Sequence, residues 1–138
     1  ELIPLWSGDN DWLPGSRMRN WDLCESPDLV VEETTISLIP GGLPRYWAAM
    51  EEFGPTMLSP PRRDILATWY AMTGRLHVVD SYVVFRSMAD RETLRAAARE
   101  NDARIAFDKA VREIVIAHDT TFLRPVRVSE MSPMFMLD

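Results

Sequence analysis

The fold of this protein is decided by the stretch LHVVDSYVVF, residues 76–85. Valine and aromatic residues dominate it, and the turn signal Thr73-Gly74 precedes it, so it is predicted to be a β-strand that follows a tight turn. Successive side chains of a strand point to opposite faces, and here both sets are mostly apolar. An antiparallel sheet with one face in water alternates apolar and polar residues instead. Both faces of this strand are therefore expected to be covered.

Three further strands are predicted around this stretch. Residues 65–72 are rich in β-branched and aromatic residues and form a hairpin with it across Thr73-Gly74. Residues 29–39 are rich in Val, Ile and Thr, and Pro40-Gly41-Gly42 ends them. The last strand is expected to cover residues 119–128.

Two helical segments lie between these strands. The first begins near Pro44 and ends before Pro60-Pro61, because its apolar residues recur at spacings of three and four. The second begins at Ser87, with Asp90 three residues later as in a capping box. Residues 101–102 interrupt this helix. In the part that follows, one apolar face is formed by Phe107, Val111, Ile114 and Val115.

The order strand, helix, strand, strand, helix, strand predicts an α+β fold of the ferredoxin-like βαββαβ type. Its four-stranded antiparallel sheet would carry helices on one face only. The other face needs a cover, and a second copy is the simplest candidate because two-fold homodimers are the commonest assemblies. The N-terminal arm is the alternative cover.

That arm comprises residues 1–28, and residues 29–138 form the domain. The arm contains Trp6, Trp12 and Trp21 among turn-forming residues and has no period of 2 or 3.6. A disordered tail rarely contains so many tryptophans. We expect the arm to be irregular but packed, with the indoles as anchors.

Composition excludes several classes of function. The 138 residues carry a net charge of −6, which argues against a nucleic-acid partner. No run of 18 apolar residues and no secretory signal are visible, so neither a membrane span nor export is expected, and a cytoplasmic location is predicted. No phosphate-binding glycine loop or Cys/His cluster is present, and neither a cofactor nor a metal is expected.

Several motifs resemble those of the NIPSNAP family. They are the Pro40-Gly41 turn, residues 74–79, the stretch FRSMADRE at residues 85–92 with Arg95, and residues 118–125 followed by Ser129 and Ser132-Pro133. The resemblance covers about residues 29–134. It implies a dimeric α/β barrel, in which two sheets pack face to face. Many members carry a His-His pair at the positions of Asp80 and Ser81, and the glutamate before the last strand is Asp119 here. The wider barrel group includes cofactor-free oxygenases, isomerases, cyclases and haem-handling enzymes.

Asp80 is the first candidate for catalysis. It lies between Val78 and Tyr82 on one strand face, and a carboxylate in apolar surroundings suits a general acid or base. The alternative is a structural ion pair with an arginine. His77 and His118 can also titrate near neutral pH, or can be exposed or capping residues.

Substrate contacts are expected from aromatic residues and one glutamate. Glu32 and Glu33 lie on opposite faces of the first strand, so one points inward and needs a partner. Glu32 is the candidate. Aromatic rings at helical or strand spacing either line a cavity or fill the core. The candidates for substrate contact are Tyr46, Trp47, Trp69 and Tyr70. Tyr82 is expected to assist Asp80 in catalysis.

The sequence is consistent with two functions. The first is a small cofactor-independent enzyme that cyclises, isomerises or oxygenates an apolar carbonyl-bearing or aromatic metabolite in a barrel pocket. By analogy with enzymes of the wider barrel group, such an enzyme is expected to serve bacterial specialised metabolism. The second is a non-catalytic small-molecule-binding or scaffold protein.

Overall fold

A computed structural model describes residues 2–6, 28–58 and 65–126 of the chain. The strands in these ranges form one antiparallel sheet, in the order β1-β3-β4-β2-β5. The strands are β1 (Leu2–Trp6), β2 (Val30–Leu38), β3 (Ile65–Ala71), β4 (Val78–Phe85) and β5 (Val115–Leu123). The helices are α1 (Gly42–Met57), α2 (Met88–Arg99) and α3 (Asp102–Val111).

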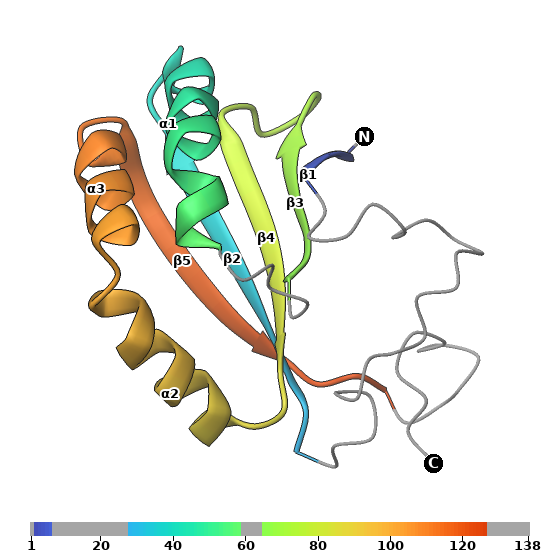
Figure 1. Ribbon diagram of the computed structural model, residues 1–138. Helices are drawn as coiled ribbons and strands as arrows, with labels where there is room; N and C mark the ends of the chain where they lie inside the picture. Colours follow the sequence, from blue (N-terminus) through green and yellow to red (C-terminus); the bar gives the residue numbers. More distant parts are fainter. Residues whose placement is uncertain (1, 7–27, 59–64, 127–138) are drawn as a thin grey trace.

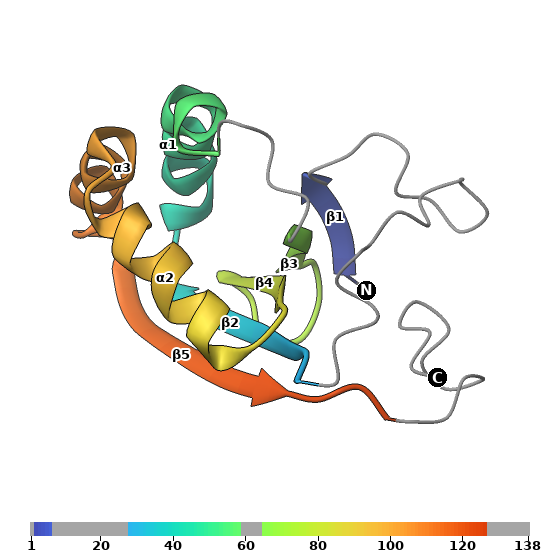
Figure 2. The same ribbon diagram turned by 60° about the horizontal axis from the view of Figure 1, so that its bottom comes forward.

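Strands β2 to β5 with the helices between them form the predicted ferredoxin-like arrangement. The first and third strands of that unit, β2 and β4, pair at its centre, and β3 and β5 flank them. The helices α1, α2 and α3 lie on one side of the sheet (Figures 1 and 2). The predicted fold is confirmed, and one sheet face carries no helix from the described ranges.

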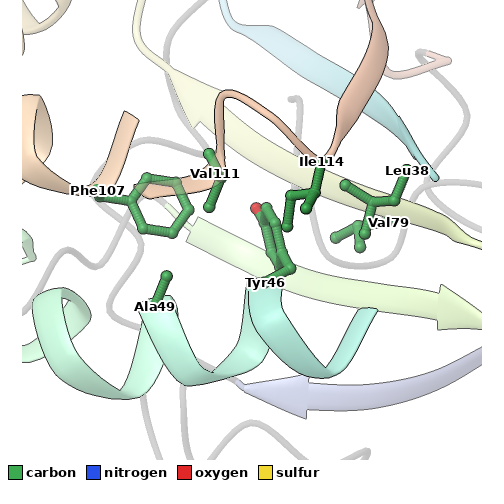
Figure 3. Packing of buried hydrophobic residues seen from close by; sticks show 7 residues of the cluster. All are labelled: Leu38, Tyr46, Ala49, Val79, Phe107, Val111 and Ile114. Carbon is green, nitrogen blue, oxygen red and sulfur yellow. The ribbon is translucent and has the colours of Figure 1, made fainter. Parts of the chain in front are cut away.

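The main core lies between the sheet and the helices α1 and α3 (Figure 3). Tyr46 is its centre, with its ring edge-on to Phe107 at a centroid distance of 5.5 Å. The cluster consists of Leu38, Tyr46, Ala49, Val79, Phe107, Val111 and Ile114. Val79 identifies the helix side of β4, so Ser81 and Val83 share that side with it, whereas Asp80 and Tyr82 point away.

Side-chain caps begin the two C-terminal helices. Ser87 Oγ accepts a 3.2 Å hydrogen bond from the Asp90 amide, as the capping-box pattern predicts. Asp90 in turn accepts from the amide of Arg86 at 3.1 Å. Asn101 Oδ1 accepts from the Arg104 amide at 3.0 Å and starts α3. The predicted interruption at residues 101–102 is therefore a genuine helix start.

The structure corrects three predicted boundaries. His77 has a φ of 61°, in the left-handed region, so β4 begins at Val78 and not at Leu76. The last strand is Val115–Leu123 and not 119–128, because α3 already ends at Val111. Residues 2–6 of the arm form strand β1 along β3, so the prediction of an irregular arm is wrong there. The predictions for Trp12, Trp21 and Pro60-Pro61 lie outside the described residues.

Candidate functional site

The helix-free face of the sheet has a row of polar residues across its middle. Cross-strand partners in an antiparallel sheet lie on the same face, so the register defines this row. Asp80 is opposite both Thr35 on β2 and Trp69 on β3. The row continues on β5 with Asp119, which is opposite Thr35.

A second row lies one step along the strands. Tyr82 is opposite both Glu33 on β2 and Ala67 on β3, and Thr121 on β5 follows Glu33. Two ionisable side chains of β4 therefore point from the same face at neighbouring positions.

Each of them is fixed by a hydrogen bond to β2. Thr35 Oγ1 donates to Asp80 Oδ1 at 2.6 Å, and the Tyr82 hydroxyl donates to Glu33 Oε1 at 2.6 Å. All four side chains are half-buried. A carboxylate has about four lone-pair sites, so Asp80 retains acceptor capacity beyond the bond from Thr35.

The phenol of Tyr82 holds its proton tightly. Partial burial, the hydrogen bond to Glu33 and the negative charges of Glu33 and Asp80 together raise the pKa of Tyr82 to about 12. At neutral pH Tyr82 is therefore a hydrogen-bond donor and not a base. The face thus combines a carboxylate that can accept a proton with a phenol that can donate a hydrogen bond.

Apolar side chains border these rows on one side. Leu29, Val31 and Val84 are buried together, and Leu66 and Tyr82 pack against them. Leu123 on β5 is opposite Val31 and is 39% exposed. Of these apolar side chains, Leu123 is therefore the one that an apolar molecule on the polar rows would contact.

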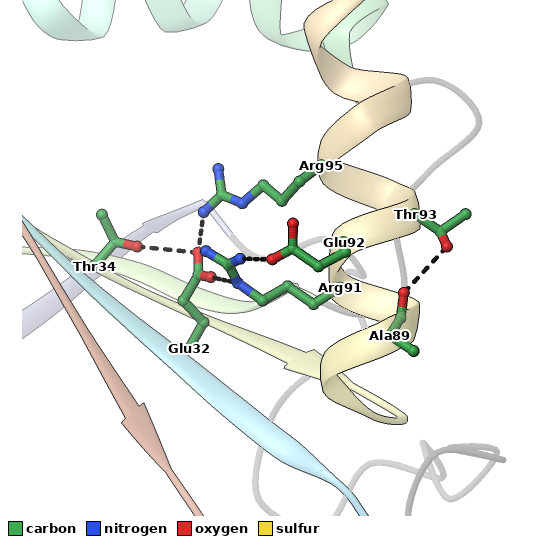
Figure 4. Close-up of polar contacts among 7 residues, drawn as sticks. All are labelled: Glu32, Thr34, Ala89, Arg91, Glu92, Thr93 and Arg95. Carbon is green, nitrogen blue, oxygen red and sulfur yellow. Dashed lines mark hydrogen bonds and ion pairs between the residues drawn. The ribbon is translucent and has the colours of Figure 1, made fainter.

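Glu32 lies on the opposite side of the sheet, under α2. Its carboxylate is fully buried and forms ion pairs with Arg91 and Arg95 (Figure 4). Thr34 Oγ1 approaches it at 3.5 Å. The prediction that the inward glutamate needs a partner is correct, and Arg91 of the FRSMADRE segment and the following Arg95 supply it. Glu32 therefore does not share a face with Asp80, and substrate contact remains a prediction for it.

The two histidines do not join Asp80. His118 is exposed on β5 and is the register partner of Ile36, which packs against the helix-side core. His77 lies before β4, where its carbonyl accepts a 2.8 Å hydrogen bond from the Leu38 amide. His118 therefore lies on the helix side of the sheet, opposite to Asp80, and a catalytic role of either histidine stays a prediction.

The predicted aromatic contacts divide between the two faces. Trp69 lies beside Asp80 in the helix-free row. Tyr46 and Trp47 pack on the helix side, where the Trp47 ring is 6.3 Å from Tyr70. Burial raises the pKa of Tyr46 to about 12. The positions of Tyr46, Trp47 and Tyr70 favour core packing over substrate contact. Among the four aromatic candidates, Trp69 is the neighbour of Asp80.

Sequence reasoning missed Thr35 as a partner of Asp80. The signal was present in the alternation of β2, which places Glu33 and Thr35 on one face. What was missing was the register with β4, which aligns them with Tyr82 and Asp80.

Comparisons with known proteins agree with this architecture. A NIPSNAP family protein from Agrobacterium tumefaciens is 20% identical with a TM-score of 0.66, and the match covers 72% of this chain and 87% of that one. An uncharacterised NIPSNAP-like domain protein from Burkholderia xenovorans is 19% identical with a TM-score of 0.65, covering 71% and 85%.

A candidate antibiotic biosynthesis monooxygenase from Caulobacter crescentus shares the fold at 12% identity, with a TM-score of 0.54 and coverage of 74% and 93%. Identities this low show the fold alone. No functionally curated protein matches the chain in sequence.

Within the described ranges, no helix has both the length and the apolar character needed to cross a bilayer. The family model for NIPSNAP matches residues 31–130, which include the whole of β5 and both rows of the helix-free face. The resemblance inferred from the motifs is confirmed, and this chain belongs to the NIPSNAP family.

Proposed function

We propose that this protein is a small cofactor-independent enzyme that transfers a proton on an apolar metabolite bearing a carbonyl group. One observation carries the proposal: Asp80 and Tyr82 extend from neighbouring positions of the helix-free face. Asp80 is oriented by the hydrogen bond that it accepts from Thr35, and Tyr82 by the one that it donates to Glu33. Removing a proton from the carbon beside a carbonyl requires a base and a hydrogen-bond donor, and no redox group.

In this mechanism Asp80 takes the proton from the substrate carbon. The electron pair of the broken C–H bond moves to the carbonyl oxygen and gives an enolate. The Tyr82 hydroxyl, which keeps its proton to about pH 12, turns from Glu33 to the enolate oxygen and stabilises the charge by a hydrogen bond. Where the substrate carries a β,γ-double bond, this enolate is a dienolate; Asp80 then returns the proton to the γ-carbon, the double bond moves into conjugation with the carbonyl, and the net reaction is an isomerisation.

The pocket for this reaction requires a cover over the helix-free face. A second copy of the chain, packed sheet to sheet, would enclose the polar rows between two layers. The exposed Leu123 and the half-buried Leu66 lie beside those rows and would contact the hydrocarbon part of the substrate. We therefore include the homodimer in the proposal.

The test uses 1-tetralone, an apolar aromatic ketone, in deuterated buffer. The wild-type protein is expected to speed deuterium incorporation at the α-carbon, followed by proton NMR. Asp80→Asn keeps the shape and removes the base, and general-base catalysis contributes about 10²–10⁴-fold. A loss of at least about 10²-fold is therefore expected. Asp119→Asn, in the same row on β5, is the matched control and should retain the rate.

Two outcomes would contradict the proposal. Full exchange by Asp80→Asn would remove Asp80 from the mechanism. Saturable binding of the ketone without any exchange, detected by ligand-observed NMR, would favour the alternative of a non-catalytic binding protein.

A further inference from the structure

Helix α2 is attached to the rest of the protein in a different way from α1 and α3. Those two helices bury residues such as Tyr46 and Phe107 against the sheet. None of the residues of α2 is buried. Because packing of an apolar face normally stabilises a helix in a protein, α2 must be held in place by other contacts.

Those contacts are ionic and come from two arginines. Arg91 and Arg95, one helical turn apart, extend from α2 to the buried carboxylate of Glu32 on β2 (Figure 4). Arg91 also lies over the ring of Phe122 on β5, 4.8 Å from the ring centroid, and pairs with the exposed Glu92 of its own helix. The arginine side chains therefore span the distance between helix and sheet.

The hydrogen bonds of α2 are self-contained. Ser87 caps its N-terminus, and Thr93 Oγ1 donates to the carbonyl of Ala89 at 3.1 Å. At its C-terminus the amide of Glu100 bonds to the Ala97 carbonyl, and Asn101 then starts α3 with a cap of its own. None of these bonds requires contact with the sheet, so α2 can move as an intact helix about its two short junctions.

We propose that α2 is a hinged lid over the helix side of the sheet, held closed by an ionic latch of Glu32 with Arg91 and Arg95. The hinges lie just outside these bonds: between Phe85 and Arg86, whose amide bonds to Asp90, and at Asn101, whose amide bonds to Ala98 while its carbonyl belongs to α3. The lid covers the Glu32 end of β2 and the Phe122 end of β5, which lie next to each other in the sheet. Breaking the latch on the sheet side should release the helix while leaving its internal hydrogen bonds intact.

The test measures the distance between nitroxide labels on α2 and α1. Cysteines replace the exposed residues Ala96 and Glu51 in a Cys24→Ser background, and the labelled protein is diluted with unlabelled protein so that only distances within one chain are recorded. The key comparison is between Glu32→Gln and Glu33→Gln. These consecutive residues lie on opposite faces, so the second variant is the matched control.

The wild-type protein and the Glu33→Gln variant should each give one narrow distribution of label-to-label distances by pulsed electron paramagnetic resonance. Glu32→Gln should give a broad distribution or one shifted to longer distances, with an unchanged far-UV circular dichroism spectrum. An unchanged narrow distribution in Glu32→Gln would overturn the proposal. So would a loss of helical signal, because α2 would then be melting and not moving.

A second pair of variants covers the case in which Glu32→Gln does not fold. Arg95→Gln removes one of the two ion pairs of the latch and leaves the buried Glu32 paired with Arg91, so it is a milder change than Glu32→Gln. Arg99→Gln removes an exposed arginine from the last turn of the same helix. Broadening in Arg95→Gln alone supports the latch, and equal distributions in both variants contradict it.

Discussion

Glu32 and Glu33 are consecutive residues of β2 that have different partners on opposite faces of one sheet: cationic for Glu32 and neutral for Glu33. Glu32 is fully buried against Arg91 and Arg95, whereas Glu33 accepts a hydrogen bond from the neutral phenol of Tyr82. One carboxylate therefore holds a helix to the sheet, and the other orients a candidate catalytic hydroxyl. The two positions offer a direct comparison of their roles.

Replacement of these two glutamates should affect stability unequally. Glu32→Gln leaves two guanidinium groups without their carboxylate, and hydrogen bonds to charged groups contribute about 1.5–3 kcal/mol each. We expect the free energy of unfolding to fall by about 2–3 kcal/mol, since both arginines can reach water after the change. Glu33→Gln should cost less than about 1 kcal/mol, because the amide oxygen still accepts from Tyr82. Urea denaturation measures both, and equal losses would contradict the assignment.

Tyr82 should make the protein sensitive to alkaline pH. Its pKa is 10.0 in the unfolded chain and about 12 in the folded protein, so the folded state binds the phenolic proton more tightly. The resulting stabilisation is fully present below pH 10 and is lost as the pH rises towards 12. Tyr82→Phe should therefore lose less stability than the wild type between pH 10 and 12, although Tyr46 still titrates there. Melting temperatures at intervals across this range give the comparison, and parallel curves would exclude a contribution from Tyr82.

The helix-free face should be the contact between two copies. Light scattering is expected to give twice the 15.8 kDa of one chain. Leu123→Arg places a charge beside Val31 on that face and should raise the dimer dissociation constant at least about tenfold, which corresponds to about 1.4 kcal/mol. Ile105→Arg changes an exposed apolar residue on α3, away from that face, and should leave the dimer intact. A monomeric wild type, or dissociation by Ile105→Arg alone, would argue against this interface.

His77 should be replaceable by glycine. A left-handed conformation costs a non-glycine residue about 1–2 kcal/mol, and glycine adopts it freely but loses more chain entropy on folding. We expect His77→Gly to match the wild type or exceed it by up to about 1 kcal/mol. His77→Val should lose about 1 kcal/mol, because a β-branched residue is disfavoured more strongly than histidine at a positive φ. Thermal unfolding of the two variants distinguishes this backbone role from a side-chain role. A large loss in His77→Gly would show that the imidazole itself is needed.

Much of the fold could be predicted from local patterns. The alternation in residues 76–85 placed Asp80 and Tyr82 on one face, and the same rule separated Glu32 from Glu33. The Ser87-Asp90 spacing predicted the start of α2, because a cap involves only residues within one turn. These features depend on neighbours in the chain, which is why the sequence alone determined them.

The site depended on contacts that sequence periodicity does not contain. Thr35 and Asp80 are 45 residues apart and meet only through the register of β2 with β4. Alternation could not tell which face the helices cover, because both faces of β4 are apolar; the packing of Val79 against α1 and α3 decided it. The left-handed His77 and the pairing of β1 with β3 likewise belong to the assembled sheet. Local chemistry thus determined which residues share a face, and only tertiary structure decided which partners they meet there.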